Sequence, residues 1–282
     1  MGTKGMAMFE KFSRSWELVK ASAAVLRSDK ELMLFPMISA AATLMVLATF
    51  LVPMIGWRVF QHGFGVSAAV WTFLFYFCQY TVILFFNSAL VGAAMIRLEG
   101  GDPSLADGLN AAKARLPAIL GYAAIAATVG LVLKRMKDDS HFLVRLLGGG
   151  LGAAWTLATF LVVPVLVSQD IGPVDALKKS AGLLKRTWGE NAIGNIGIGA
   201  AFGLIMFAVI VVGVLLAYAA AQLSMALAVV IAVLFVIAAL LLGVYQSALS
   251  GIYSAALYRY ATHGEAPPAF QGLHLESAFQ PK

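Results

Sequence analysis

The sequence is poor in charge. Only 12% of its 282 residues are Asp, Glu, Lys or Arg, and 61% are apolar. A soluble domain is about 25% charged and roughly 45–50% apolar, and one of this size has too little interior to hide such an excess of apolar surface. Together with a mean hydropathy of +0.86, the scarcity of charge excludes soluble enzymes, nucleic-acid-binding proteins, collagen-like fibres and disordered chains. Most of the chain is therefore predicted to be solvated by lipid.

Cysteine and histidine are also scarce. Cys78, the single cysteine, lies in an apolar run, so the sequence supports neither a disulfide framework nor a thiolate metal site. The four histidines lie outside the apolar runs and lack the spacing of metal ligands on one helix face. Phosphate-binding and dinucleotide-binding glycine motifs are absent as well. We therefore expect no enzyme activity, no catalytic residues, no metal site and no cofactor.

What the sequence does contain is long apolar runs. About 20 helical residues cross a hydrocarbon core of about 30 Å, and six runs are of roughly this length. They cover approximately residues 32–52, 68–97, 116–133, 146–168, 192–217 and 223–248, the last continuing as a helix to residue 260. The predicted fold is all-α, a polytopic bundle of six transmembrane helices. Ionisable residues within spans usually mark coupled transport, and because these runs have none in their interiors, a pump or coupled transporter is disfavoured.

The basic residues predict the orientation. Lys and Arg outnumber Asp and Glu by 20 to 14, and most of them lie in segments that are cytoplasmic if the N-terminus is inside. The positive-inside rule then places both termini in the cytoplasm. The first 30 residues lack the apolar stretch and cleavage site of a signal peptide. We expect residues 1–8 to be a disordered or tag-like N-terminus, residues 9–260 a single membrane domain, and residues 261–282 a cytoplasmic tail.

Three segments between the apolar runs are amphipathic. Apolar residues recur at helical spacing within residues 9–26, 105–116 and 174–188, and basic residues lie on the other faces. Such helices lie flat at the lipid headgroups on the cytoplasmic side, or alternatively pack their apolar faces on the spans, and the sequence leaves both readings open. The predicted headgroup contacts are Lys178, Lys179, Lys185, Arg186 and Trp188. The same segments suggest a threefold repeat of one amphipathic helix, one outward span and one returning span, over residues 9–97, 102–168 and 172–260.

Proline and glycine make further predictions for the helices. Pro164 lies inside the fourth run and frees the carbonyl of Phe160, which predicts a kink there. Glycines in the fourth and fifth runs predict close approach by a neighbouring helix. These glycines are Gly148, Gly152, Gly194, Gly197, Gly199 and Gly203.

Four amide side chains lie within the spans: Gln79, Asn87, Asn195 and Gln246. An amide inside a membrane usually hydrogen-bonds to another helix, contributing about 0.6–2 kcal/mol. If the four amides converge instead, they line a polar cavity. The sequence alone does not choose between these readings.

Several stretches carry a resemblance to a known family. They are residues 16–20 (WELVK), 29–36 (DKELMLFP), 157–166 (LATFLVVPVL), 172–173 (GP), 185–190 (KRTWGE) and 194–199 (GNIGIG). Over roughly residues 9–260 the chain resembles a family of bacterial and archaeal six-span membrane proteins of unknown function. More loosely, it is similar to the membrane domain found beside glycerophosphodiester phosphodiesterases. The resemblance implies the fold and a place in the plasma (inner) membrane of a prokaryote, and it implies no activity.

Two functions fit these observations. The first is a non-catalytic integral membrane protein that organises lipids or acts as a scaffold, with anionic membrane lipids as partners. A second copy of the chain or another membrane protein is a further candidate partner, and nucleic acid is not. The alternative is a channel or passive transporter with an uncharged polar path past the four amides.

Overall fold

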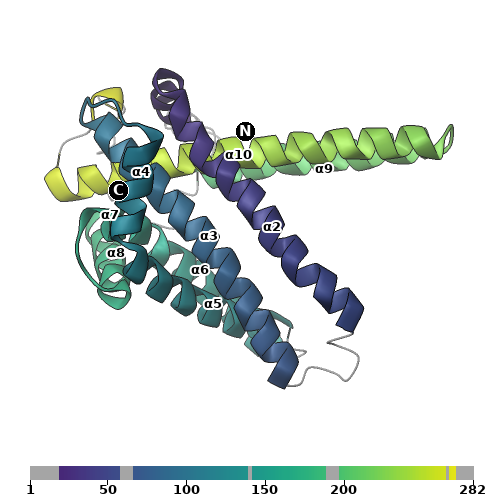
Figure 1. The fold of residues 1–282 in the computed structure, drawn as a ribbon, viewed down its shortest axis with the longest axis horizontal. Helices are drawn as coiled ribbons and strands as arrows, with labels where there is room; N and C mark the ends of the chain where they lie inside the picture. The colour runs from purple at the N-terminus through teal and green to yellow at the C-terminus, as the bar shows by residue number, and fades with distance from the viewer. Residues whose placement is uncertain (1–18, 58–65, 139–141, 189–196, 265–266, 271–282) are drawn as a thin grey trace, which may run out of the picture.

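A computed structural model describes residues 19–57, 66–138, 142–188, 197–264 and 267–270. Within these ranges the chain is helical and has no strand, which confirms the predicted all-α fold (Figure 1). A helix over residues 19–28 comes first. It is followed by η1 (Lys30–Met33), α2 (Leu34–Trp57), α3 (Val66–Leu98), α4 (Leu105–Ala114), α5 (Leu116–Asp138), α6 (Phe142–Thr159), α7 (Val162–Ser168), α8 (Pro173–Trp188), α9 (Gly197–Ala221), α10 (Met225–His263) and η3 (Pro268–Phe270).

Within the described residues, six helical stretches are long and apolar enough to cross a membrane, the number that the sequence predicts. They are Lys30–Val52, Ser67–Leu98, Leu116–Lys137, Gly149–Ser168, Phe202–Ala221 and Met225–His263. Large apolar side chains on these helices are widely exposed, and in α9 both Leu204 and Phe207 are 64% exposed. A contiguous exposed apolar surface of this kind is typical of protein that faces lipid. The chain is therefore consistent with a multi-pass membrane protein.

Two of these helices are longer than a membrane is thick. The sixth span, predicted over residues 223–248 with a helical extension to residue 260, is the 39-residue α10, which ends where Gly264 takes a left-handed φ of 77°. At 1.5 Å per residue, α10 is about 58 Å long and the 33-residue α3 about 50 Å. Both exceed the hydrocarbon core of about 30 Å. One end of each helix therefore extends past that core.

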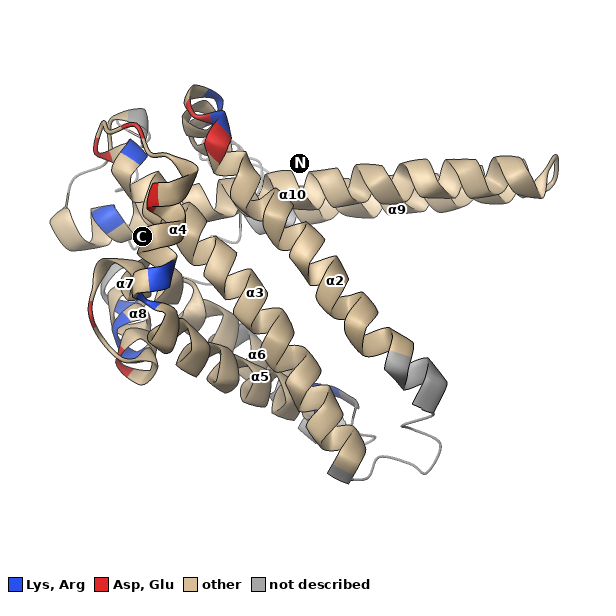
Figure 2. Cartoon of the chain, viewed as in Figure 1, with Lys and Arg blue, Asp and Glu red and all other residues tan. Residues whose placement is uncertain are grey.

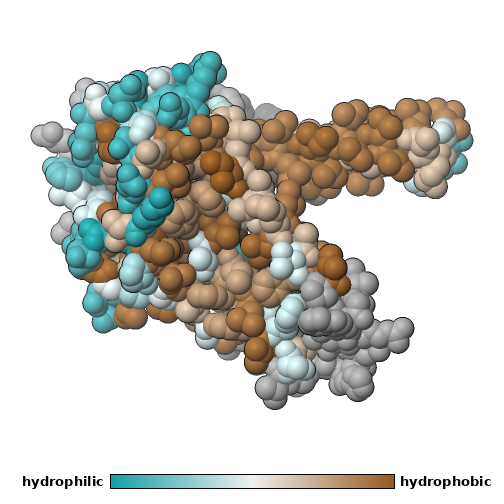
Figure 3. Space-filling view, viewed as in Figure 1, coloured by the Kyte–Doolittle hydropathy of each residue, from teal (hydrophilic) through white to brown (hydrophobic). Residues whose placement is uncertain are grey.

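Charged residues gather at one end of the molecule, which we call the charged end (Figure 2). It consists of residues 19–33, α4, α8 and the last turns of α3, α7 and α10. The surface is hydrophilic at this end and apolar along the rest of the helices (Figure 3). The start and finish of the described chain also meet here, because Pro268 lines the same surface hollow as Ala24 and Val25.

The start of α4 shows how local sequence forms one of these short helices. Ser104 is its N-cap, and its backbone N–H and hydroxyl donate hydrogen bonds of 2.9 and 2.7 Å to Oδ2 of Asp107. The Asp107 backbone N–H donates a 3.3 Å bond to Oγ of Ser104, which completes a capping box. The hydrogen bond from the Ser104 side chain, followed by that from its backbone, lowers the pKa of the Asp107 carboxyl. The carboxylate thus stays ionised beside the positive end of the helix dipole.

The order of elements repeats three times along the chain. A short helix is followed by two spans in the helix at 19–28 with α2 and α3, in α4 with α5 and α6–α7, and in α8 with α9 and α10. The threefold repeat of the units 9–97, 102–168 and 172–260 stays a prediction. Residues 9–18 and 189–196 of these units lie outside the described part of the chain.

The core lies where the returning helices α3, α7 and α10 pack together beside the charged end. Its most buried large side chains have at most 1% of their surface exposed: Leu90, Val91, Val162, Leu166, Ile252 and Leu257. The ends of the three helices are joined by polar contacts. Nη1 of Arg259 lies 3.1 Å from Oε1 of Glu99, and Nε2 of Gln169 donates a 2.7 Å hydrogen bond to the Tyr258 hydroxyl.

The fourth span is broken rather than continuous. α6 ends at Thr159 and α7 begins at Val162, so the break lies at Phe160 and Leu161. Pro164 is the third residue of α7, where an N–H has no partner within the helix and its loss costs no hydrogen bond. The backbone N–H of Leu161 instead donates a 3.1 Å bond to Oγ of Ser180 in α8, and both residues are buried. Thus α8 satisfies a backbone group that the break exposes.

Close helix packing uses other glycines than those predicted. A Cβ on Gly203 would meet nothing within 4 Å, so that part of the prediction is wrong, and a Cβ on Gly152 would only make an ordinary 3.6 Å contact with Lys137. Gly194 lies outside the described residues, and the surroundings of Gly148, Gly197 and Gly199 are not described either. The closest approaches occur at Gly108, where a Cβ would overlap the Phe35 ring and lie 2.6 Å from the Ala89 carbonyl oxygen, and at Gly251, where it would overlap Leu90.

The hairpin of α9 and α10 diverges from the other spans. Both hairpin helices leave the charged end in one direction, while α2, α3, α5 and α6 leave it in another (Figure 1). Between residues 225 and 247 of α10 only Ala228 is buried. Beyond the core, therefore, α10 packs mainly against α9 and shows most of its apolar side chains to the surroundings.

Candidate functional site

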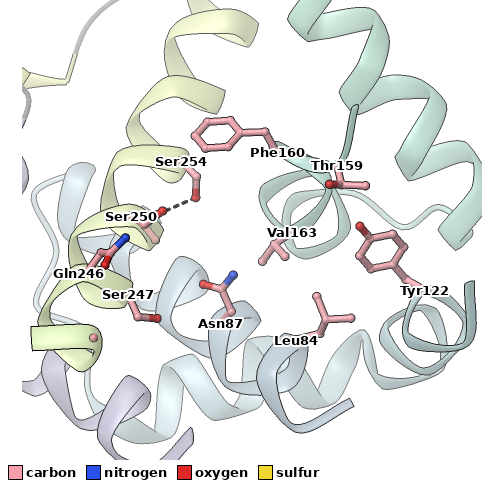
Figure 4. A pocket seen from close by; sticks show the side chains of 12 residues that line it. Leu84, Asn87, Tyr122, Thr159, Phe160, Val163, Gln246, Ser247, Ser250 and Ser254 are labelled. Atoms are coloured by element: carbon pink, nitrogen blue, oxygen red, sulfur yellow. Dashed lines mark hydrogen bonds between the residues drawn. The ribbon is translucent and has the colours of Figure 1, made fainter. Parts of the chain in front are cut away.

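A cavity of about 430 Å³ lies where α10 diverges from the other spans (Figure 4). Its walls come from α3, α5, the α6–α7 junction and α10. From α10 it receives the polar side chains of Gln246, Ser247, Ser250 and Ser254. From the other helices it receives those of Asn87, Tyr122 and Thr159, and Leu84, Phe160 and Val163 complete most of the apolar wall.

None of the lining residues that the structure describes is Asp, Glu, Lys, Arg or His. The polar groups are amides and hydroxyls, which donate and accept hydrogen bonds without a net charge. Asn87 points into the space between the α10 side chains on one side and Tyr122 and Thr159 on the other (Figure 4). The site therefore suits a polar but uncharged group.

Only part of this polar lining is hydrogen-bonded within the protein. Oγ of Ser254 donates to the Gly251 carbonyl at 2.9 Å, and Oγ1 of Thr159 donates to the Trp155 carbonyl at 2.9 Å. Four other side chains bond to none of the described residues: Asn87, Gln246, Ser247 and Ser250. Their donors and acceptors remain free to bind a molecule in the cavity.

The cavity lies at membrane depth. Asn87 precedes Arg97 by ten residues of α3, and Gln246 precedes Arg259 by thirteen residues of α10. At 1.5 Å per residue these separations are about 15 and 20 Å from the charged end. A hydrocarbon core is about 30 Å thick, so with Arg97 and Arg259 at the headgroups the two amides would lie near the middle of that core.

The core separates the cavity from the charged end. Leu90 and Val91 of α3, and Ala255 and Leu257 of α10, are each at most 1% exposed. They come between the cavity residues and the charged residues Arg97 and Arg259 along their own helices. Among the described residues we therefore find no continuous polar path from the cavity to the charged end.

The structure brings together two of the four predicted amides. Asn87 and Gln246 line the same cavity, while Gln79 does not line it and has a buried Oε1 without a hydrogen-bond partner. Asn195 lies outside the described residues. Sequence reasoning missed the contribution of Ser250 and Ser254, although Ser247, Ser250 and Ser254 follow the i, i+3, i+7 spacing of one helix face. Nothing in the sequence indicates that Tyr122 and Thr159 line a cavity.

The predicted headgroup contacts lie on α8 at the charged end. Lys178, Lys179 and Lys185 are exposed, and the side chains of Arg186 and Trp188 are not described. Nζ of Lys178 lies 3.6 Å from Asp175, and Nζ of Lys179 donates a 2.6 Å hydrogen bond to Oε1 of Gln169. Lys185 has no partner among the described residues.

The opposite face of α8 packs on the spans. Its buried residues are Ala176, Ser180, Leu183 and Leu184, and its neighbours are α5, α6 and α7. Part of the apolar face of α8 is thus covered by protein, while Val174 at its start is 50% exposed. Both alternatives that the sequence left open therefore remain predictions. The exposed lysines of α8 face outward at the charged end.

Metal chemistry has no candidate centre in the described part of the chain, since no three His, Cys, Asp or Glu residues cluster there. The described carboxylates of the charged end are partnered in several places by arginine: Arg97 lies 3.3 Å from Asp102, and Arg115 pairs with Asp170. These contacts hold loops to helices and are exposed on the carboxylate side. They resemble structural ion pairs more than a reactive site.

The profile of one protein family, described as a family of unknown function (DUF6159), matches residues 66–268. The match includes every helix that lines the cavity and begins after the first span, so it is shorter than the resemblance over residues 9–260. Neither the curated proteins nor the solved structures include a significant match to this chain. Because the matched region is well over half of the sequence, the chain belongs to the DUF6159 family, whose function is unknown.

Proposed function

We propose that this protein is a non-catalytic integral membrane protein that binds anionic lipid headgroups at its charged end. The observation that supports the proposal is a set of exposed lysines on three short helices at one end: Lys20 in the helix at 19–28, Lys113 in α4, and Lys178, Lys179 and Lys185 in α8. Lys20, Lys113 and Lys185 have no ionic partner among the described residues. A lysine near an anionic membrane surface contributes about 1 kcal/mol to binding.

The positive-inside rule supports a cytoplasmic location for this end, in the plasma (inner) membrane of a prokaryote. The short helices would then lie at the level of the headgroups, with their apolar faces on the spans and their lysines directed at lipid phosphates. A scaffold that gathers anionic lipids requires no reactive residues. The similarity to the membrane domain beside glycerophosphodiester phosphodiesterases stays a prediction and adds no activity to this proposal.

The test is a measurement of lipid affinity by native mass spectrometry on the detergent-purified full chain, with dioleoylphosphatidylglycerol as the added lipid. The double variant Lys178→Gln, Lys185→Gln should bind about 30-fold more weakly, the product of two contributions of about 1 kcal/mol. The matched control is Lys134→Gln with Lys137→Gln, which removes the same charge from exposed positions at the other end of α5. An equal loss of affinity in both double variants would show that the charged end has no special role.

The cavity favours a second candidate, a passive path for a small uncharged solute. Its amides and hydroxyls would replace the hydration of such a solute. The core argues against a path through the whole protein, because its buried apolar side chains separate the cavity from the charged end. Glycerol-driven swelling of proteoliposomes distinguishes the two proposals, since a lipid-binding protein without a path leaves the swelling rate equal to that of empty vesicles.

A further inference from the structure

The uncharged cavity needs an occupant. Asn87, Gln246, Ser247 and Ser250 place free hydrogen-bonding groups near the middle of the hydrocarbon core, where a polar group without a partner is unfavourable. The four side chains come from two helices and face one space, so a single molecule can reach them together. A volume of about 430 Å³ is within the range of sites that bind small ligands, roughly 300–1,000 Å³.

The lining determines the charge of that occupant. Among the described residues, no acidic or basic side chain lines the cavity, so a phosphate or an ammonium group would be buried there without a counter-ion from them. Burying an unpaired charge in a medium of low dielectric constant is strongly unfavourable. Hydroxyl, ester or amide groups would instead pair with the amides of Asn87 and Gln246 and with the serine hydroxyls, because these both donate and accept.

The surroundings of the cavity determine the route of entry. The core closes the side toward the charged end, with Leu90 and Ile252 among its fully buried side chains. On the other side α10 leaves the bundle, and between residues 225 and 247 it buries only Ala228. The open approach is therefore along the apolar surface of α10. A molecule that arrives through hydrocarbon and ends in a polar site is an amphiphile.

We propose that the cavity binds the hydroxyl-bearing head of an uncharged lipid, such as a diacylglycerol, whose acyl chains lie along α10. The uncharged head hydrogen-bonds to Asn87, Gln246, Ser247 and Ser250, and the chains stay in the hydrocarbon. This site is about 15–20 Å from the charged end along α3 and α10. The inference does not rest on the anionic-lipid contacts proposed above, and either can fail without the other.

The experiment compares two photoactivatable lipids that carry the same diazirine-labelled acyl chain. One is a diacylglycerol and the other is a phosphatidylglycerol, and each is added to the detergent-purified full chain before irradiation and peptide mapping. We expect the diacylglycerol to label peptides of α10 and of the α6–α7 junction, and the phosphatidylglycerol to leave these peptides at background. Equal labelling of the cavity peptides by both probes would overturn the proposal, as would labelling by neither, which would indicate a cavity that holds water alone.

A matched pair of glycine variants tests the site itself. A Cβ on Gly243, which lines the cavity, meets nothing within 4 Å, and the same is true of Gly203 in α9. Gly243→Leu should fill the cavity and abolish diacylglycerol labelling, whereas Gly203→Leu should preserve it. Both changes place a better helix former in a helix, so both variants should fold. Equal labelling of the two variants would place the lipid elsewhere.

A second pair tests the hydrogen bonds. Asn87→Leu removes an amide that lines the cavity, while Gln79→Leu removes one from the same helix that does not. Asn87→Leu should weaken diacylglycerol binding roughly 3- to 20-fold, the range expected for one hydrogen bond within a membrane. Gln79→Leu should leave binding unchanged. If Asn87→Leu binds as tightly as the unaltered chain, the polar head does not occupy this cavity.

Discussion

At the scale of single residues, α3 carries two amides with different surroundings. Asn87 faces the cavity, whereas Oε1 of Gln79 is buried without a hydrogen-bond partner. A buried polar atom in this state destabilises a fold, because it has lost its solvent and gained no partner. An amide side chain in one helix therefore lines a cavity at one position and is a buried, unpartnered group at another.

This difference predicts a gain in stability from Gln79→Leu. Replacing the unpaired amide with an apolar side chain of similar size should raise the free energy of unfolding by about 1 kcal/mol and increase the melting temperature. Thermal unfolding of the detergent-purified protein measures the melting temperature. Gln222→Leu, at the exposed turn after α9, is the control and should not raise the melting temperature. A lower melting temperature for Gln79→Leu would show that the amide has a partner after all.

At the scale of elements, the short helices are held on the spans by close backbone contacts. α4 packs on α3 at Gly108, which lies against the Ala89 carbonyl and the ring of Phe35 at the start of α2. α8 packs on the break between α6 and α7, where Ser180 accepts a hydrogen bond from Leu161. Each short helix thus depends on a particular residue pair that links it to a span.

We predict that Gly108→Ala destabilises the protein by about 1–3 kcal/mol, the usual effect of adding a methylene group to a well-packed core. A Cβ at this position would lie 2.6 Å from the Ala89 carbonyl oxygen, and that backbone atom cannot move without shifting α3. The control is Gly182→Ala in α8, where a Cβ meets nothing within 4 Å. That control should stabilise the protein by up to about 1 kcal/mol through helix propensity. Equal melting temperatures for both variants would argue against the close packing of α4.

At the scale of the whole molecule, most of the charge that the structure describes lies at one end, a smaller basic group lies at the far end of α5, and apolar surface covers most of the helices between them (Figures 2 and 3). This distribution matches a protein that crosses the hydrocarbon core and keeps its charges at the headgroups. The proposed orientation places Lys113 in the cytoplasm and Lys134 outside.

Accessibility of single cysteines should test this orientation. In a Cys78→Ser background, Lys134→Cys should react with a membrane-impermeant maleimide in intact cells, and Lys113→Cys should react only after the membrane is permeabilised. Both lysines are exposed in the structure, so a difference in labelling reflects the side of the membrane and not burial. The reverse pattern would invert the topology and would place the charged end outside.

The sequence was a good guide wherever a property depends on neighbours along the chain. Apolar length predicted six spans, and for α2 the predicted residues 32–52 lie close to Lys30–Val52. Helical spacing predicted that Val174 and Leu177 belong to a short helix, which is α8. Proline chemistry pointed to the stretch around Phe160, where the fourth span is broken. Each of these rests on interactions within a turn or two of helix.

Contacts between distant segments were harder to predict. Gly108, Gly213 and Gly251 are among the glycines with a close neighbour, whereas a Cβ on Gly203 would meet nothing within 4 Å. A glycine in the sequence shows where a second helix could approach closely. Which segment actually packs there depends on the tertiary structure. For the same reason the sequence could not predict which amides share a cavity. Asn87 and Gln246 line one cavity because α3 and α10 cross near Gly251. Gln79 lies about two helical turns away from that crossing along α3.

The sequence by itself determined that this chain is a six-span helical membrane protein, because the free energy of placing apolar helices in lipid is a sum over local residues. Its few charges, absent from the interiors of the spans, also determined that the membrane part has little ionisable chemistry. Only the tertiary structure decided which polar groups share a cavity, that buried apolar side chains separate the cavity from the charged end, and that α8 packs on α5, α6 and α7. These properties depend on which helices cross and at which residues they cross. The crossings are determined by packing between segments that are far apart in the chain.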